Sequence, residues 1–282
     1  MHKSLVLVLA AACGAASAQT PANNPMPDGS RDMYVGLGIV STPEWDGARA
    51  RKERLLPVLQ VQWSNGVFVS GMSAGMHLSD RPSVEYGPLV SVVPRRDASG
   101  TGGFVGGMSG EGVKLQPSGE TFAAPPVGLH GMRSIGTRIE AGGFYNQYLS
   151  ERLRLNNTLV YGAGHQRRGL RYAIDVQHLA ADLAPRHKLS ASVGLTFVNS
   201  AHNAAYFGVT GEESLLTRYR AYAPRGGLRD VHAGVRWNYA LSPAWMLASQ
   251  LHVTSLRGDA AKSPLTQRST NTTVSTALAY RF

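Results

Sequence analysis

The sequence predicts an all-β fold, a transmembrane antiparallel up-and-down β-barrel preceded by a signal peptide. Three observations carry this prediction. Apolar and polar residues alternate with period two through most of the chain after residue 31. After the first twenty residues there is no apolar run of about 18 residues, whereas a barrel strand needs only about 9–11 alternating residues. The chain also ends on Phe282 directly after an alternating run, although a soluble domain usually ends in frayed polar residues.

The first segment is expected to be removed on export. Residues 1–18 combine a basic start, an apolar run and a small-x-small site, which predicts a secretory signal peptide cleaved between Ala18 and Gln19. Lipidation of the single cysteine, Cys13, is the alternative. Cleavage would leave no cysteine for a disulfide, a nucleophile or a metal site. Residues 19–31 are expected to form a flexible periplasmic lead-in, and residues 32–282 a single barrel domain.

Eleven alternating segments are predicted as strands. They lie near residues 33–41, 54–64, 67–78, 84–94, 135–145, 152–161, 170–177, 189–197, 231–241, 245–253 and 271–282. Asn65-Gly66, between the second and third, predicts a tight hairpin turn. Because a closed single-chain barrel has an even number of strands, we expect twelve, with ten as the alternative. The twelfth strand is placed at Thr101–Met108.

Three segments interrupt the alternation. Residues 43–53 predict a charged loop, and residues 95–133 a long connection rich in Gly and Pro. Residues 200–229 carry the only helical pattern, a turn or two around Glu212, Glu213, Leu215, Leu216 and Tyr219. Short turns thus alternate with long connections, as they do between the two ends of an outer-membrane barrel.

Aromatic residues near strand ends favour a membrane barrel over a soluble secreted β-protein, which is the alternative. These residues are Tyr145, Tyr161, Trp237, Tyr239, Trp245, Tyr280 and Phe282. The opposite faces mix charged and small residues, as expected for a narrow lumen. The predicted lumen charges are Arg138, Glu140, Arg154, Arg171, Asp175, Arg236 and Arg281. We favour a charge-paired plug that rigidifies a small barrel, with a pore selective for small anions as the alternative.

Neither the charge nor the motifs predict an enzyme. The formal net charge is +10, but its arginines are dispersed and export argues against a nucleic-acid partner. Gly71-Met72-Ser73-Ala74-Gly75 matches a nucleophile elbow, which requires a strand-to-helix turn, yet it lies within an alternating segment. The histidines lack zinc-site spacing. No catalytic, cofactor or metal residue is predicted; a barrel enzyme that modifies lipids is the remaining enzymatic alternative.

Motifs throughout the mature chain resemble the MipA/OmpV family of outer-membrane proteins. They are Pro43-Glu44-Trp45-Asp46-Gly47, Gly87-Pro88, Arg95-Arg96, Tyr206-Phe207-Gly208-Val209, Tyr222, Gly227-Leu228-Arg229-Asp230, the stretch from Leu256 to Pro264, and Tyr280-Arg281-Phe282. Trp45 departs from the family's Tyr, and residues 97–133 form a longer segment than the family's linker.

The resemblance implies a non-enzymatic protein of the bacterial outer membrane. One family member is a scaffold that joins a lytic transglycosylase, which degrades murein, to a penicillin-binding protein, which synthesises it. The expected function is therefore a scaffold or adaptor in peptidoglycan maintenance. Other members are associated with osmotic or pH response, and a small-solute channel or porin-like stress-responsive protein is the alternative.

The final segment is predicted to close the barrel. Val274, Leu278 and Tyr280 should face lipid, and Ser275, Ala277 and Ala279 the interior. Tyr280 and Phe282 resemble the C-terminal aromatic signal read by the barrel insertion machinery, which implies a periplasmic C-terminus.

Overall fold

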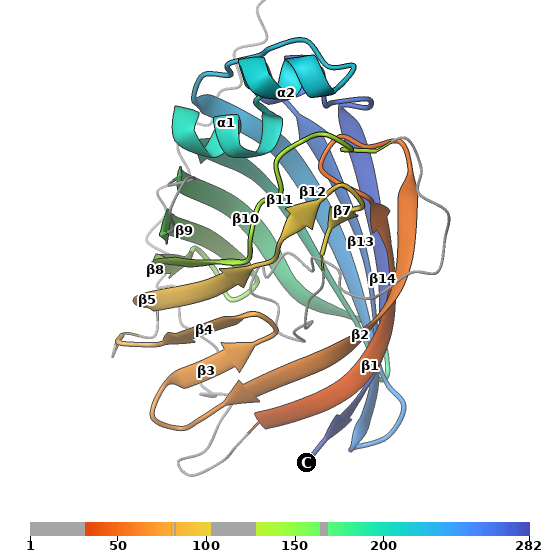
Figure 1. Cartoon of the computed structure of the whole chain (residues 1–282). Helices are drawn as coiled ribbons and strands as arrows, with labels where there is room; N and C mark the ends of the chain where they lie inside the picture. The colour runs from red at the N-terminus through yellow and green to blue at the C-terminus, as the bar shows by residue number, and fades with distance from the viewer. Residues whose placement is uncertain (1–31, 80, 82, 103–127, 164–168) are drawn as a thin grey trace, which may run out of the picture.

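A closed antiparallel barrel forms the body of the protein (Figure 1). The computed structural model describes residues 32–79, 81, 83–102, 128–163 and 169–282. The predicted signal peptide and lead-in lie outside these ranges. Each barrel strand pairs with the next along the chain, and β1 and β14 close the sheet with Leu37 opposite Leu278. The strands are β1 (Asp32–Pro43), β2 (Arg51–Gln62), β3 (Val67–Ser70), β4 (Ser73–Met76), β5 (Val84–Val93), β8 (Arg138–Tyr148), β9 (Leu153–Ala163), β10 (Gly169–Ala184), β11 (His187–Val198), β12 (Gly227–Ala240), β13 (Trp245–Leu256) and β14 (Thr270–Arg281).

The described residues thus confirm the predicted twelve barrel strands, but the predicted position of the twelfth is wrong. The segment near 67–78 is not one strand: it folds into the hairpin of β3 and β4, whose turn contains Gly71 at φ +58°. A left-handed backbone of this kind strongly favours glycine. Thr101 lies in β7 (Gly100–Thr101), which pairs with β6 (Arg96–Asp97) outside the barrel sheet, and residues 103–108 lie outside the described ranges.

Alternation places apolar side chains outside the barrel and polar or small ones within it. Leu37 and Ile39 are 66% and 59% exposed, whereas Gly38 between them is buried. An exception on the inner face is the buried apolar cluster of Val40, Leu56, Val58 and Ala279. In β14, Val274, Leu278 and Tyr280 are exposed as predicted, and Ser275 and Ala279 are buried. Such an outward apolar band is the pattern that a surrounding bilayer selects.

Among the described residues, no helix is both long and apolar enough to span a bilayer.

Short helices gather at the barrel end opposite the C-terminus (Figure 1). They are α1 (Ser200–Phe207), α2 (Gly211–Leu216) and α3 (Gly258–Lys262). The helical pattern predicted around residues 212–219 corresponds to α2, which begins with a capping box of Thr210 and Glu213. The sequence reading missed α1 and α3, whose few residues give too little periodicity to detect. The predicted loop 43–53 is shorter than expected, because β2 already begins at Arg51.

Candidate functional site

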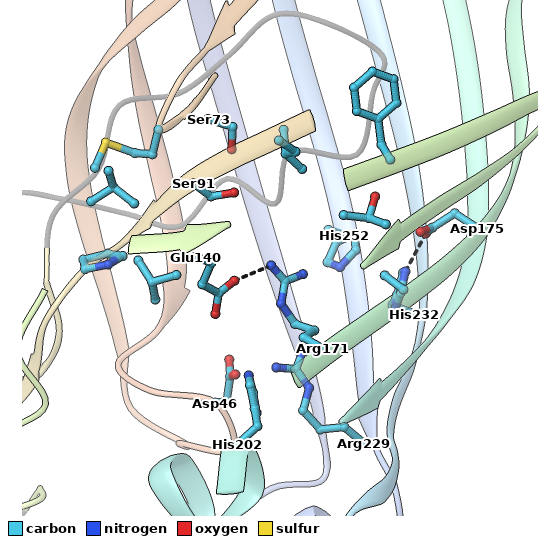
Figure 2. A pocket seen from close by; sticks show the side chains of 18 of the residues that line it. Asp46, Ser73, Ser91, Glu140, Arg171, Asp175, His202, Arg229, His232 and His252 are labelled. Atoms are coloured by element: carbon cyan, nitrogen blue, oxygen red, sulfur yellow. Dashed lines mark hydrogen bonds and ion pairs between the residues drawn. The ribbon is translucent and has the colours of Figure 1, made fainter. Parts of the chain in front are cut away.

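A cavity of about 230 Å³ lies inside the barrel, between the strands and the connections at the end opposite the C-terminus. Its lining combines apolar residues from the β3–β4 hairpin and β5 with charged residues from β8, β10 and β12. β8 lies directly beside β5, with Glu140 opposite Ser91 and Arg138 opposite Val93. In Figure 2, Ser73 and Ser91 lie on the hairpin side, and Arg171 and Arg229 reach in from the opposite side.

Glu140 is the centre of the first charged cluster. This carboxylate is 1% exposed and accepts hydrogen bonds from Arg138 Nη2 at 2.6 Å and from Arg171 Nη2 at 2.8 Å (Figure 2). The Arg138 guanidinium also lies over the ring of Tyr206, 4.9 Å from its centroid. Two arginines on β8 and β10 therefore share one buried carboxylate, and charge-assisted bonds of this kind are stronger than neutral ones.

His232 is the centre of the second cluster. Its Nδ1 lies 2.8 Å from Asp230 Oδ1 and its Nε2 lies 2.6 Å from Asp175 Oδ1 (Figure 2). Arg229 bonds the other oxygen of Asp230 at 2.6 Å. An imidazolium could donate to both carboxylates at once. Basic side chains thus alternate with carboxylates in one hydrogen-bonded chain, which links two non-adjacent strands, β10 and β12. Its members are Arg229, Asp230, His232 and Asp175.

Gly194 makes this contact across the intervening strand possible. It sits on β11 directly between Asp175 of β10 and His232 of β12. A Cβ at this position would meet the Asp175 carboxylate and would lie 2.6 Å from His232 Nε2. Because Gly194 has no side chain, the Asp175 carboxylate and the His232 ring can contact each other over β11.

The other predicted lumen charges fall in different surroundings. Arg154 is buried and donates to Gln177 Oε1 at 2.9 Å, with Glu85 at 3.4 Å. Arg236 donates to Gln250 Oε1 at 3.0 Å. Arg281 is exposed at the end of β14 and takes no part in the cavity lining among the described residues. Arg138, Glu140, Arg171 and Asp175 are therefore the predicted charges that meet at the cavity.

The sequence reading missed Arg229, Asp230 and His232 as members of the site. His232 lies four residues before Arg236 and so shares its polar face in an alternating strand, which means that the alternation contained a signal. It could not show that β10 and β12 side chains meet, because that depends on strand register and on Gly194.

An apolar core closes the end of the barrel opposite the C-terminus. We call it the outer cap: Trp45, Ala48, Leu129, Met132, Val209, Tyr219 and Leu265, all buried. Trp45 Nε1 donates to the carbonyl of Leu265 at 3.0 Å, which joins the β1–β2 and β13–β14 connections. Loops with a packed core of their own present a fixed surface rather than a set of independent segments.

The motifs that suggested the family resemblance converge near this cap. Ser263 Oγ donates to the carbonyl of Phe207 at 2.6 Å, and Tyr222 Oη to the carbonyl of Asp259 at 2.9 Å. Burial and the nearby Asp259 carboxylate raise the pKa of the Tyr222 phenol, so it stays a donor. Residues far apart in sequence thus form one hydrogen-bonded unit, which gives these motifs a structural role.

Ser73 does not occupy a nucleophile elbow. It begins β4 in the tight hairpin, whereas the elbow needs a strand that turns into a helix. Within the part of the chain that the structure describes, no group of three or more His, Cys, Asp or Glu side chains is arranged to hold a metal ion.

The two terminal aromatic residues lie on the outer surface. The rings of Tyr280 and Phe282 stack with centroids 6.3 Å apart, and Trp245 meets Tyr280 edge-on at 5.1 Å. The backbone N–H of Phe282 donates to the carbonyl of Met33 at 3.1 Å. The last residue is therefore tied to β1, at the seam where the barrel closes.

Comparison with solved structures returns outer-membrane barrels of low sequence identity. The KdgM porin is 9% identical, with 88% of this chain and 99% of that chain covered and a TM-score of 0.45. The NanC porin is 10% identical, with 89% and 100% covered and a TM-score of 0.47. The channel DcaP of Acinetobacter baumannii is 9% identical, with 94% and 100% covered and a TM-score of 0.40.

No curated protein matches the chain. A family model does: that of the MltA-interacting protein MipA matches residues 35–282, which is nearly the whole described barrel. The match agrees with the closed barrel and its outward apolar band. The chain belongs to the MltA-interacting protein MipA family and is a β-barrel of the bacterial outer membrane.

Proposed function

We propose that this protein is a non-enzymatic scaffold or adaptor that holds a murein hydrolase and a murein synthase together at the outer membrane. The family description names an interaction with MltA, and our sequence reading associates the family with a lytic transglycosylase and a penicillin-binding protein. The observation that carries the proposal furthest is the closed barrel interior: its charges are paired with one another and its outer end is capped.

The paired charges favour a rigid body over an open pore. Glu140 holds Arg138 and Arg171, and His232 holds Asp175 and Asp230, so side chains from β8, β10 and β12 are tied together along the inner wall. We propose that the predicted lumen charges rigidify the barrel. A rigid body is what a scaffold needs, because a fixed surface loses less entropy when partners bind.

The short turns at the C-terminal end offer the contact surface for periplasmic enzymes. In outer-membrane barrels short turns face the periplasm and long connections face outward. Glu151, exposed in the turn between β8 and β9, belongs to this end, whereas Leu215 of α2 is 87% exposed at the opposite end. A periplasmic partner enzyme should therefore contact Glu151 and not Leu215.

Photo-crosslinking in cells tests this. A photo-reactive amino acid at Glu151 should capture a lytic transglycosylase or a penicillin-binding protein, identified by mass spectrometry. The same group at Leu215 is the matched control and should not. Equal capture at both positions, or none at Glu151 together with no such enzyme in a pull-down from solubilised envelopes, would remove the support for scaffolding.

The cavity favours a second candidate, a small-solute channel. Four guanidinium groups line it among the described residues, from Arg96, Arg138, Arg171 and Arg229. Planar-bilayer recordings decide between the two: well-resolved, anion-selective conductance steps would support the channel, and their absence the rigid scaffold.

A lipid-modifying barrel enzyme is the remaining alternative. Ser73 lines the cavity and is the serine that its motif would make the nucleophile. If Ser73→Ala leaves any lipid or ester hydrolysis by the purified protein unchanged, this serine has no catalytic role.

A further inference from the structure

Two arginines follow the end of the β13–β14 ladder side by side. Beyond the last paired residues of this ladder, Leu256 N still donates to Ser269 O at 2.7 Å. Arg257 and Arg268 come next on the two strands, so the register places them opposite each other, and both are exposed. Like charges directly opposite each other on neighbouring strands are destabilising. The pair is therefore unfavourable unless an anion lies against it.

Both arginines lie on the outer face of the wall. Leu256 is 2% exposed and lines an inner cavity, so its neighbours Ser255 and Arg257 lie on the other face. Ser255 Oγ lies 3.2 Å from Thr270 Oγ1, and Arg268, two residues before Thr270, shares that face by alternation. The outer wall of β13 and β14 thus ends in a pair of hydroxyls followed by a pair of guanidinium groups.

A third arginine is fixed on the same outer face. Arg51, exposed at the start of β2, extends across β1 and donates from Nη1 to the carbonyl of Thr272 at 2.7 Å. Its Nε and Nη2 donate to Ser41 Oγ, and Nη2 also donates to the carbonyl of Ser41 at 2.9 Å. A guanidinium has five N–H donors, and the acceptors of these four bonds are all neutral. Arg51 therefore keeps its charge and at least one N–H for an anion.

The nearby carboxylates do not neutralise these three arginines. Among the described residues, none of the three forms an ion pair, and neither does Glu53 on the outer face of β2. Asp259 accepts a hydrogen bond from Arg225 N at 2.8 Å, and Asp46 lines the inner cavities. Three arginines against Glu53 and Asp259 leave a positive surface.

The height of this surface matches the head-group region of a membrane. The outer face of β13 and β14 begins at the far end with the aromatic pair of Trp245 and Tyr280. With a rise of about 3.4 Å per residue and a tilt of about 35–45°, each residue advances about 2.6 Å along the membrane normal. Thr270 then lies about 26 Å from Tyr280, and Arg268 about 31 Å. Since the apolar band of such a barrel is about 25 Å tall, the arginines lie just beyond its edge.

We propose that the outer surface at this end binds the phosphate groups of lipopolysaccharide, the phosphorylated glycolipid of the outer leaflet. Guanidinium groups bind phosphate oxygens through paired, charge-assisted hydrogen bonds. Whichever hydroxyl accepts in the Ser255–Thr270 pair keeps its own O–H for a further acceptor. The acyl chains lie along the apolar face below, where Leu251 and Val274 are each 45% exposed. We call this site the arginine rim: Arg51, Arg257, Arg268, Ser255 and Thr270.

The proposal goes beyond scaffolding and does not depend on it. It rests instead on the expected orientation of the barrel, in which long connections face outward. The β13–β14 connection belongs to the end opposite the C-terminus, because β14 starts there and runs to the last residues of the chain (Figure 1).

Titration of the purified full chain in detergent, followed by native mass spectrometry, tests the proposal. The probes are diphosphorylated lipid A, which is the membrane anchor of lipopolysaccharide, dephosphorylated lipid A, phosphatidylglycerol and inorganic phosphate. We expect saturable binding of the first probe and binding at least tenfold weaker for the other three. Comparable binding of dephosphorylated lipid A would show that the phosphates are not recognised. Comparable binding of phosphatidylglycerol or of inorganic phosphate would make the rim a general anionic-lipid or anion site. Each of these results overturns the proposal, as does a lack of saturable lipid A binding.

Variants locate the site. The double variant Arg257→Gln with Arg268→Gln should weaken binding of diphosphorylated lipid A about tenfold or more, because each arginine gives a charge-assisted hydrogen bond. Arg51→Gln should weaken it less, because one guanidinium is lost. The matched control is Arg152→Gln with Lys188→Gln, which removes two exposed charges at the opposite end and should leave binding unchanged. Unchanged binding in the first double variant, or an equal loss in the control, would contradict the proposal.

Stability without lipid separates a binding role from a structural one. Because Arg257 and Arg268 repel each other when no anion is bound, their double variant should unfold in urea at the same midpoint as the unaltered barrel or at a higher one. A heat-modifiable band on gels shows that each variant is folded. A clearly lowered midpoint in the lipid-free protein would mean that the pair stabilises the barrel itself and would count against the arginine rim.

Discussion

Two parts of the barrel wall obey the same sequence pattern but differ in completeness. From β8 to β14 the barrel strands have 11 to 16 residues and every strand has a neighbour on each side. From β2 to β5 the wall contains the four-residue arms of a hairpin. The complete wall carries the cross-strand contacts of Glu140 with Arg171 and of His232 with Asp175, and the interrupted wall contributes Phe68, Met72 and Ser73 to the cavity lining. The alternation of apolar and polar residues therefore predicts which face of the sheet a residue lies on, but not where a strand ends.

Deleting Phe282 should have the largest effect, because it acts where β14 closes the complete wall onto β1. The aromatic signal would be lost together with the hydrogen bond from Phe282 N to Met33 O. We expect most of the protein to be absent from the outer membrane as a folded, heat-modifiable species in fractionated cells. Phe282→Tyr keeps the aromatic ring and should assemble. Normal assembly of the deletion variant would remove the assembly role assigned to this residue.

The substitution Glu140→Gln tests how much the buried ion pairs stabilise the complete wall. The change leaves Arg138 and Arg171 buried without a carboxylate, and breaking a buried ion pair from one side costs about 3–5 kcal/mol. Urea unfolding of the protein refolded into vesicles measures the loss. Glu212→Gln breaks the exposed pair with Arg133 and should cost less than about 1 kcal/mol. Equal costs would mean that the interior pair is solvated like a surface one.

A pair of prolines compares the two walls directly. Val235→Pro removes an N–H from β12, which pairs on both sides. The partner carbonyl is left unsatisfied, which should cost about 1–3 kcal/mol. Leu55→Pro changes the edge of β2 that faces away from β1, the same edge as Pro57, where no described strand pairs with it, and should cost clearly less. Unfolding in urea gives both values. If Leu55→Pro proved as costly as Val235→Pro, this edge of β2 would have to be hydrogen-bonded to a neighbour.

Gly194→Ala probes the smallest of these effects. The added methyl must displace Asp175 or His232, and such overpacking costs about 1–3 kcal/mol. Gly136→Ala is the matched control, since a Cβ there meets nothing within 4 Å. Unfolding midpoints of the two variants should differ accordingly. Indistinguishable midpoints would show that the contact between β10 and β12 contributes little.

Much of the fold was predictable because barrel strands leave a local signature. In β12 and β13 the alternation extends over most of each strand, and the Asn65-Gly66 turn follows from the backbone preference of glycine; Gly66 N donates to Trp63 O there. The β3–β4 hairpin escaped detection because its arms and its turn at Gly71-Met72 together have the length of one strand. Local sequence does not distinguish a continuous strand from two short ones in this case.

The site was less predictable because it depends on register. Glu140, Arg171 and Asp175 could be assigned to the interior from alternation alone. Their partners depend on which residues lie opposite one another, and the link from Asp175 to His232 also depends on a glycine in the strand between them. Short helices such as α1 depend on caps, here Asn199, and on contacts with distant loops, neither of which gives a periodic pattern.

The hydrogen bond from Trp45 to Leu265 joins connections separated by 220 positions in the chain. The face at this end, which the predicted periplasmic C-terminus would place outside the cell, is therefore a discontinuous epitope, completed only when the first and last connections meet. An antibody raised against that face should recognise the closed barrel and ignore peptides from either loop. Exchanging one loop for a relative's would then require exchanging the other as well.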